Sequence, residues 1–477
     1  MTTLSPKAQE ESTTTTDVGH GDSVQVLSEF EDTTRVKVFA ATREHAKSLS
    51  AEIAAMYEEA LGKGGLQKKG HEAYPDSDLF TAKGIESTLE AGERLIAVAQ
   101  MEEEGKDVIV GAMVADHMSP HHVEFNSMAV PVKRRGHKIG SHIVRGLVDI
   151  IEKSESKFTV NATELVTHSM ASQAAHFHNG FRAICGFGFC HYPHVFFKDH
   201  PESVLWVTRF QGQVVPNLRR FRSALGRQLG RHLADVKHKL IASQASGQVH
   251  LSSGRLDAES LNLIGEVLKE RTAYVPKRYH DLVQAILFQF EDVLDVGVKS
   301  YVRPESVSEA GVHAKDEKEK IDNLTIEPKE GFGHSYIIFK KDFVFDEKEV
   351  AKAIKTVHKM DKRYIKVCIP ANTAEAIKAA DYLNEQGFVF HSYLPLYGYT
   401  EQAQAADDEG HAVTKAPEFY DILSLQWIKP SVVKANPLPG ETDSVIKLYG
   451  YPENLSGEIV KMLAGELHLH MNKKELG

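Results

Sequence analysis

An apolar run, a basic segment with two glycines and an amphipathic helix pattern follow one another without a break between residues 123 and 154. The apolar run VEFNSMAV ends at Val130, and the basic segment VKRRGHKIGS (132–141) comes next. The helix pattern then has one apolar face, made of Ile139, Ile143, Leu147 and Ile150 or Ile151. This order predicts a strand, a tight loop and a covering helix, and so places the segment in an α/β fold.

The loop itself has the properties of an anion-binding site. The first amide groups of a helix lack intrahelical partners, and the helix dipole adds partial positive charge there. Glycine lets such a backbone come close to a phosphate. The basic side chains around the glycines are Lys133, Arg134, Arg135, His137 and Lys138. The segment therefore predicts a pyrophosphate site, and a plain basic loop between strand and helix is the alternative.

The residues on either side of the loop extend this α/β pattern from residue 35 to residue 210. Periodicity predicts a strand, two helices, three strands, a helix, a strand, a helix and two strands. In order, these are strand 35–41, helices 43–61 and 84–92, strands 94–100, 108–118 and 123–130, helix 138–154, strand 158–166, helix 169–181, and strands 194–198 and 203–210. The acidic segment MEEEGKD (101–107) predicts a turn between two of the strands.

A second region, 256–430, repeats part of this order. It predicts helices at 278–292, 346–360 and 374–388, and strands at 336–344, 364–370, 389–398 and 420–428. The segments HNGF (178–181) and EQGF (385–388) each end a helix with a glycine, and each precedes two strands. The shared order predicts a duplicated fold in which one half is degenerate.

Length and composition limit the class of protein. A chain of 477 residues predicts two or three domains, and its net charge of −10 argues against a general nucleic-acid binder. Three cysteines do not form a disulfide framework, which favours a reducing compartment. No apolar run approaches the length of a membrane helix, and the polar residues 1–34 are expected to be a disordered tail. We therefore expect a cytoplasmic protein that binds neither nucleic acid nor membranes.

A basic helix is predicted at 216–240, within a helical linker that spans 213–255. Its apolar face lies beside seven Arg or Lys residues and a single Asp. A bridging helix with a solvated basic face is one interpretation. The other is a docking surface for an acidic partner such as an acyl carrier protein. Beyond the second region, 431–477 is predicted to be a C-terminal extension.

The strand, loop and helix described above resemble the acetyl-CoA motif of the GNAT superfamily of N-acyltransferases. In that family the loop reads Q/R-x-x-G-x-G/A, and here Arg135 to Gly140 occupy the six positions. Arg135 and Gly140 match the two ends, whereas Lys138 stands where the middle glycine is usual. A lysine there restricts the backbone, and it either weakens CoA binding or adds a charge contact to a phosphate.

A second segment also resembles the family, as does the element order of residues 35–210. GNAT domains carry N-x-x-A-x-x-L-Y-E-K-L-G-F on the helix after the fifth strand, and SMASQAAHFHNGF (169–181) fills that frame. Ser169 replaces the asparagine, and His176 replaces the tyrosine that protonates the departing CoA thiolate in the family. Histidine is a proton donor near neutral pH, so His176 is a candidate acid. A packed helix histidine is the alternative.

The resemblance implies roles for further residues. Glu124 stands where several family members place the general base, and a solvent-facing strand glutamate is the alternative. Main-chain groups of Met128 to Val130 would pair with the pantetheine arm of an acyl-CoA. The implied cofactor-binding residues are Met128, Ala129, Val130, Arg134, Arg135, Gly136, His137, Lys138, Ile139, Gly140 and Ser141.

Cysteine and histidine also form a zinc-like spacing, C-x4-C-H-x2-H, at Cys185, Cys190, His191 and His194. In a strand, adjacent residues point to opposite faces, so Cys190 and His191 would not readily share one metal ion. We therefore expect these residues to be structural and the protein to hold no metal.

The sequence thus predicts an α/β protein with two GNAT-like mixed-sheet domains, at 35–212 and 256–430, joined by a helical segment. The expected function is N-acyl transfer from acetyl-CoA or another acyl-CoA to a small-molecule or peptide amine, by direct attack. The second domain lacks a basic glycine loop and would serve as scaffold, substrate wall or homodimer surface. The alternatives are a non-catalytic GNAT-fold protein that senses CoA or holds a pathway partner, and a transferase that uses an acyl carrier protein as donor.

Overall fold

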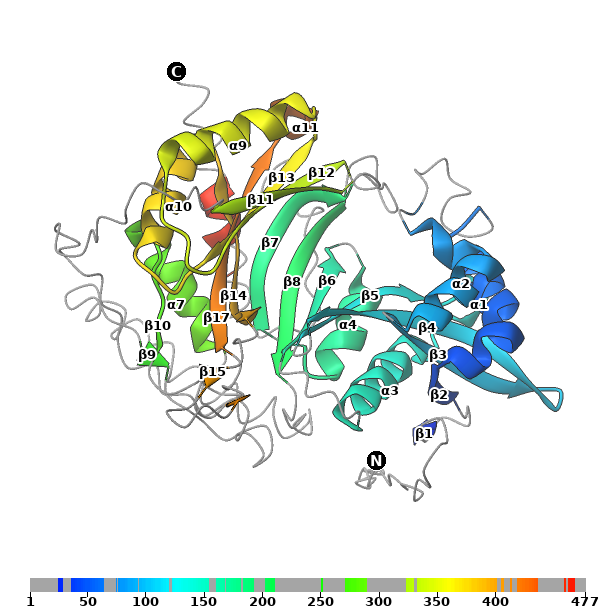
Figure 1. The fold of residues 1–477 in the computed structure, drawn as a ribbon. Helices are drawn as coiled ribbons and strands as arrows, with labels where there is room; N and C mark the ends of the chain where they lie inside the picture. The colour runs from blue at the N-terminus through cyan, green and yellow to red at the C-terminus, as the bar shows by residue number, and fades with distance from the viewer. Residues whose placement is uncertain are drawn as a thin grey trace, which may run out of the picture. The chain divides into compact units, whose positions relative to one another are not determined.

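The computed structural model describes residues 25–28, 36–63, 74, 76–92, 94–119, 122–153, 160–167, 169–181, 183–192, 202–210, 250–251, 271–289, 323–329, 333–400, 405–406, 412–413, 418–435, 459 and 462–467. They form mixed sheets with helices, which confirms the predicted α/β class (Figure 1). The chain divides into two compact units, Met1–Met118 with Glu124–Lys157, and Ser119–Val123 with Phe158–Gly477. The domain limits expected from the sequence divide the chain differently and stay a prediction.

The sheet of the first unit has the strand order β1-β2-β3-β4-β5. Its strands are β1 (Gln25–Ser28), β2 (Val36–Ala41), β3 (Arg94–Glu103), β4 (Lys106–Ser119) and β5 (His122–Ala129), which enters this unit at Glu124. The pairs from β1 to β4 are antiparallel. The predicted turn between β3 and β4 is present, with Glu104 and Gly105 at φ 52° and 78°, as a tight hairpin requires. Strand β1 lies inside the segment that the sequence predicts to be a disordered tail.

Helices cover both faces of this sheet. They are α1 (Ala46–Ala60), which follows the turn η1 (Arg43–His45), then η3 (Ser77–Phe80), α2 (Ala82–Ala91) and α3 (Ile139–Lys153). One core cluster joins Ile53 of α1 and Ile85 of α2 to Phe39 of β2. On β2 the neighbouring Val38 points the other way, and a Cβ built on Gly146 of α3 would lie 2.4 Å from it. Hence α3 packs tightly on the face opposite α1 and α2 (Figure 1).

The second unit has one sheet in the order β6-β8-β7-β14-β17-β13-β12-β11. Its larger elements are β6 (Val160–Val166), α4 (Met170–His178), β7 (Ala183–Tyr192), β8 (Glu202–Phe210), η5 (Lys277–Tyr279), α7 (His280–Phe288), β11 (Leu324–Lys329), β12 (His334–Phe339), α9 (Glu347–Lys359), β13 (Tyr364–Pro370), α10 (Glu375–Glu385), β14 (Val389–Thr400), β17 (Glu418–Ile428) and α11 (Pro430–Ala435). Two short hairpin-like pairs accompany it, β9 (His250–Leu251) with β10 (Arg271–Thr272), and β15 (Ala405–Ala406) with β16 (Ala412–Val413).

The three strands on either side of the junction of β7 and β14 have the same arrangement. Outward from the junction they are β7, β8 and β6 on one side, and β14, β17 and β13 on the other. Strand β8 lies between β6 and β7, and β17 lies between β13 and β14, all in antiparallel pairs. Each half also has a helix that ends at a left-handed glycine, Gly180 at φ 92° after α4 and Gly387 at φ 93° after α10. The order of elements after HNGF and EQGF is therefore the same, as the sequence predicts.

Strand β7 differs from the sequence prediction. The predicted strand 194–198 lies outside the described residues, and the strand that pairs with β8 is Ala183–Tyr192. The sequence pattern did not predict this strand because it contains the glycines of GFGF, and glycine is usually depleted in strands. At Gly186, however, a Cβ would lie 2.2 Å from the Cβ of Ser392 on β14. Gly186 is needed because the backbones of β7 and β14 approach closely at this position.

Among the residues that the structure describes, no helix is both long and apolar enough to span a membrane. The predicted basic helix at 216–240 lies outside the described residues.

Candidate functional site

The loop after β5 turns the chain from the sheet into α3. Pro131 begins the short turn η4 (Val132–Arg134), in which the amide of Arg134 donates to the carbonyl of Pro131 at 2.9 Å. The guanidinium of Arg135 then donates from Nε to the carbonyl of Val130 at 3.2 Å, which ties the loop back to the strand end. Helix α3 begins at Ile139, which is 2 % exposed and anchors the first turn in the core. The strand, loop and helix predicted from the sequence are confirmed.

Two residues of this loop have left-handed backbones. Gly136 has φ 94°, and Lys138 has φ 55°. The carbonyl of Lys138 accepts from the amides of Ser141 and His142 at 2.9 and 3.1 Å, so Lys138 starts the hydrogen bonding of α3. A non-glycine residue in this conformation costs about 1–2 kcal/mol. Lys138 thus adopts a backbone conformation that a glycine would take without steric cost. The turn is present with a lysine at this position, but its backbone is strained.

The space beside Gly136 is open. A Cβ built on this residue would have no neighbour within 4 Å. Arg135, His137 and Lys138 are exposed around it, while Gly140 and Ser141 in the first turn of α3 are half-buried. The amides of Ile139 and Gly140, the first two residues of α3, have no carbonyl partner four residues earlier within the helix. This part of the loop therefore has exposed basic side chains beside the first amides of a helix, and the anion site expected here stays a prediction.

Two other basic side chains of the loop hold carboxylates of the protein. Arg134 forms a two-pronged ion pair with Glu103 at the end of β3, with Nη2 donating to Oε2 at 2.7 Å and Nη1 facing Oε1. The ammonium of Lys133 lies 2.9 Å from a carboxylate oxygen of Glu59 on α1. The sequence prediction treats Arg134 as a cofactor-binding residue, but in this structure Glu103 neutralises its charge.

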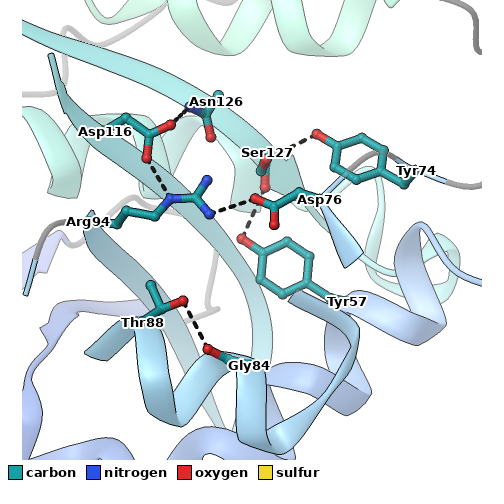
Figure 2. A network of polar contacts seen from close by, with 9 residues as sticks. All are labelled: Tyr57, Tyr74, Asp76, Gly84, Thr88, Arg94, Asp116, Asn126 and Ser127. Carbon is teal, nitrogen blue, oxygen red and sulfur yellow. Dashed lines mark hydrogen bonds and ion pairs between the residues drawn. The ribbon is translucent and has the colours of Figure 1, made fainter. Parts of the chain in front are cut away.

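Strand β5 contains an irregularity just before the loop. Ser127 has φ 51° in the middle of the strand, although β strands require negative φ. Its carbonyl accepts a hydrogen bond from the hydroxyl of Tyr57 on α1 at 3.0 Å, and its Oγ lies 3.0 Å from the hydroxyl of Tyr74 (Figure 2). Beyond it, Ala129 is buried and Met128 and Val130 are half-buried. The main chain predicted to meet the pantetheine arm thus begins at a distorted, side-chain-supported position.

A charged network supports the same region (Figure 2). Arg94 on β3 binds Asp116 through Nε at 2.5 Å and Asp76 through Nη1 at 2.7 Å. Asp116 also accepts from Nδ2 of Asn126 at 2.7 Å. Burial alone would lower the pKa of Arg94, but the charges of Asp116 and Asp76 outweigh it and raise that pKa. The network fixes Asn126, the residue before Ser127, and Asp76, which follows Tyr74 by two positions.

Both tyrosines at Ser127 keep their hydroxyl protons at neutral pH. Burial raises the pKa of Tyr57 well above its ordinary value, and nearby Tyr74 and Asp76 act in the same direction. Burial raises the pKa of Tyr74 to about 12. The sequence analysis missed Tyr57, Tyr74, Arg94, Asp116 and Ser127, because they come from five separate segments. Only the polar interruption Asn126–Ser127 of an otherwise apolar strand was visible in the sequence.

The two predicted catalytic residues belong to different compact units. Glu124 is half-buried on β5 in the first unit, on the strand face shared with Asn126. His176 lies near the end of α4 in the second unit. Each is therefore described by its own surroundings, and their roles stay predictions.

His176 is enclosed by its own unit. It is 1 % exposed, its ring packs edge-on against Phe181, and its Nδ1 lies 2.8 Å from the carbonyl of Ser172. Burial lowers the pKa of His176 to about 4, although the Ser172 carbonyl acts in the opposite direction. Because a carbonyl only accepts, the proton of the neutral ring sits on Nδ1 and Nε2 carries a lone pair. This environment is the one expected for a histidine that packs in the core. A neutral ring with a low pKa does not favour the role of proton donor at pH 7.

The buried histidine at the start of α3 is also neutral. His142 is 3 % exposed, and burial together with the charge of Lys138 lowers its pKa to about 4. His142 therefore adds no positive charge to the loop at neutral pH.

The cysteines of the zinc-like spacing lie in β7. Cys185 and Cys190 are buried, and burial raises the pKa of each thiol to about 12. Cys185 contacts the hydroxyl of Thr208 at 3.2 Å, while Nε2 of His191 lies 3.4 Å from Glu164. The expectation that these residues are structural and hold no metal ion stays a prediction. His194 lies outside the described residues.

In the second unit, helix α9 follows strand β12, which is parallel to β13. The N-terminus of α9 carries acidic side chains. The Oδ1 of Asp346 accepts from the amides of Lys348 and Glu349 at 2.8 and 3.3 Å. Glu347 and Glu349 add negative charge to the first turn. A carboxylate of the chain thus accepts from the amides that a phosphate would need at this helix start.

No model of a protein family matches this chain, and no curated protein sequence matches it. Similar solved structures include yncA of Salmonella typhimurium, described as an acetyltransferase and determined with acetyl-CoA (15 % identity, 37 % of this chain and 94 % of that chain, TM-score 0.29). Another is the ribosomal-protein-alanine N-acetyltransferase of Brucella melitensis (23 % identity, 36 % of this chain and 98 % of that chain, TM-score 0.26). A third is an acetyltransferase of the GNAT family from Streptococcus pneumoniae (14 % identity, 37 % of this chain and 99 % of that chain, TM-score 0.28). Because these TM-scores are low, the likenesses establish neither a family nor an activity for this chain.

Proposed function

We propose that the chain is an N-acyltransferase that binds an acyl-CoA at the loop between β5 and α3. The observation that carries the proposal is the pair of left-handed residues, Gly136 and Lys138, at the open N-terminus of α3. Such a turn directs successive amides toward one point, which is the geometry of phosphate-binding loops. The exposed side chains of Arg135, His137 and Lys138 add the positive charge that a pyrophosphate needs.

The residues present fit this group. The amides of Gly136 to Gly140 would face the pyrophosphate, and the strand end from Met128 to Val130 would hold the pantetheine arm. When bound, the acyl-CoA supplies an activated thioester. The acceptor's nitrogen attacks the thioester carbonyl carbon, a C–N bond forms, the C–S bond breaks, and CoA leaves as the thiolate.

The chain's own groups would manage the protons. Glu124 would accept the proton of the attacking amine, directly or through a water molecule. His176 is kept neutral with its Nε2 deprotonated, so we assign the protonation of the thiolate to solvent rather than to His176. Alignment of the two reactants would supply much of the rate acceleration.

We also infer that the second half of the chain is a degenerate copy that no longer binds CoA. Two observations support the inference: the strand order that repeats outward from β7 and β14, and the carboxylate of Asp346 on the amides of α9. The acyl carrier protein as an alternative donor depends on the helix at 216–240, which lies outside the described residues.

A non-catalytic protein that binds CoA is the second candidate. The neutral His176 and the strained Lys138 favour it, because both depart from what transfer chemistry would select. Turnover separates the two candidates: release of CoA from acetyl-CoA in the presence of a panel of amines and peptides supports the transferase, while binding without release supports the sensor.

Calorimetry with acetyl-CoA tests the site itself. The wild-type chain is expected to bind, and the double variant Arg135→Glu with Lys138→Glu is expected to bind about a hundredfold more weakly or not at all, because two charge-assisted contacts become repulsive. Lys83→Glu on α2, an exposed lysine away from the loop, is the matched control. Failure of the wild-type chain to bind any CoA thioester would overturn the proposal.

A further inference from the structure

The unusual backbone of Ser127 has a consequence for the peptide that follows it. In a trans peptide, the carbonyl of one residue and the amide N–H of the next point in opposite directions. The carbonyl of Ser127 points to the hydroxyl of Tyr57 on α1. The N–H of Met128 therefore points away from α1, and it lies two residues before Val130, where the loop begins.

Two tyrosines hold this peptide by different atoms. Tyr57 is 0 % exposed, so its hydroxyl has a fixed position under the strand, 3.0 Å from the carbonyl of Ser127. Tyr74 approaches the Oγ of the same residue at 3.0 Å (Figure 2). Strained backbone at a supported position is a feature of functional sites. Without a partner for its carbonyl, Ser127 would have little reason to keep a left-handed φ of 51°.

The support extends one step further from the peptide. Asp76, two positions after Tyr74, is bound by Arg94, and Arg94 also binds Asp116, which fixes Asn126 (Figure 2). The residue before Ser127 and the segment that carries Tyr74 are thus held by one guanidinium.

We propose that Tyr57 and Tyr74 are positioning residues that keep the Met128 N–H directed at the carbonyl oxygen of the bound acyl group. The inference rests on the proposed function, since it requires an acyl thioester along β5. The tyrosines do not touch the reacting atoms. They act through the Ser127 peptide, whose N–H would hydrogen-bond the thioester oxygen and stabilise the negative charge that develops there during attack.

The test is the infrared carbonyl band of acetyl-CoA isotope-labelled at the thioester carbonyl, measured with the full-length protein. A hydrogen bond to that oxygen lowers its stretching frequency. We expect a lowered frequency in the wild type, and a return toward the value of acetyl-CoA in water-free solvent in Tyr57→Phe. The variant should also lose about tenfold in kcat, because a misaligned donor stabilises the oxyanion less, while its affinity for CoA without an acyl group stays unchanged.

Two further variants separate positioning from general stability. Tyr279→Phe removes a different fully buried hydroxyl, one that donates to Asn384 in the second unit, and should leave the carbonyl band and kcat as in the wild type. Tyr57→Phe with Ser127→Gly should recover part of the lost kcat, since glycine takes the left-handed φ without steric cost.

The outcomes distinguish the inference from the proposed function. If the wild-type chain binds no acetyl-CoA, the proposed function fails. If it binds, but Tyr57→Phe folds and leaves both the carbonyl frequency and kcat unchanged, only the positioning role is overturned. A loss of stability in Tyr57→Phe without a change in the band also counts against it.

Discussion

Arg134 of the basic loop and Glu103 at the end of β3 form a two-pronged ion pair, with Nη2 of Arg134 2.7 Å from Oε2 of Glu103. Both side chains are about one-quarter to one-third exposed, at 26 % and 32 %. The pair fastens the loop to the sheet, and it also removes one positive charge from the proposed pyrophosphate site. The loop is therefore less basic in the folded protein than its sequence indicates.

Replacement of Glu103 by glutamine is expected to strengthen CoA binding. The amide keeps one hydrogen bond to Arg134 but no longer neutralises it, so the guanidinium can contribute to phosphate binding at a gain of about 1 kcal/mol, roughly fivefold in Kd. Calorimetry with CoA checks this at low and high salt, since the gain should shrink with ionic strength. Glu102→Gln, which removes the same charge one residue earlier, serves as control. Weaker binding in Glu103→Gln would mean that the ion pair shapes the loop more than it masks the charge.

Lys138→Gly separates the two roles that the lysine could have. Glycine adopts a φ of 55° freely, so the variant should gain up to about 1 kcal/mol of stability in urea unfolding. If the lysine only restricts the loop, CoA binding should also become tighter. If its ammonium holds a phosphate, binding should weaken by about tenfold.

Lys138→Ala is the companion variant, because it removes the ammonium but keeps the strained backbone. A phosphate contact predicts equal losses of binding in both variants. A purely restrictive lysine predicts tighter binding in Lys138→Gly alone. An alanine variant that gains as much stability as the glycine variant would contradict the strain assigned to this position.

Acid is expected to destabilise the protein below about pH 6.5. Burial lowers the pKa of His122 to about 3 and that of His176 to about 4 from the ordinary value of 6.5, and His142 follows the same direction. Between pH 6.5 and these values the unfolded chain binds protons that the folded chain does not, so the free energy of unfolding falls as pH falls. A histidine whose pKa falls to about 4 contributes about 3 kcal/mol to this loss, and His122, whose pKa falls to about 3, contributes about 5 kcal/mol.

Urea unfolding at pH 7.5 and 5 measures the effect. His176→Asn removes one such group, so its unfolding free energy should change less between the two pH values than that of the wild type, whatever its absolute stability. An identical pH dependence in both proteins would show that His176 is protonated, or absent from the core, in the folded state.

Gly186→Ala should disrupt the junction of β7 and β14. Its methyl group would meet the Cβ of Ser392 at 2.2 Å and the carbonyl oxygen of His391 at 2.4 Å, and backbone at such distances must move. We expect a loss of about 3 kcal/mol or more in unfolding free energy. Gly465→Ala, at a position with no neighbour within 4 Å of the new methyl group, is the control in the same unit. Equal stability of the two variants would contradict the close approach.

The sequence alone determined the elements whose signals are local. Alternating and helical periodicity located β2 to β6 and α1 to α4 in the right order, because each pattern is set by the neighbours along the chain. The same local reading located the turn from β5 into α3, with its glycines and basic residues. It also recognised the repeated helix-glycine-strand order that the second unit shows at Gly180 and Gly387.

Only the tertiary structure decided which of those residues are available for chemistry. Glu103 neutralises Arg134 from a different strand, and the interior of the second unit holds His176 neutral. Tyr57 and Tyr74 contact the carbonyl and the hydroxyl of Ser127 from a helix and a segment far earlier in the chain. None of these relations leaves a periodic or compositional trace. Charge state and backbone direction depend on burial and on partners that folding brings together. The loop could therefore be predicted from the sequence, but the charge states and backbone contacts of its residues could not.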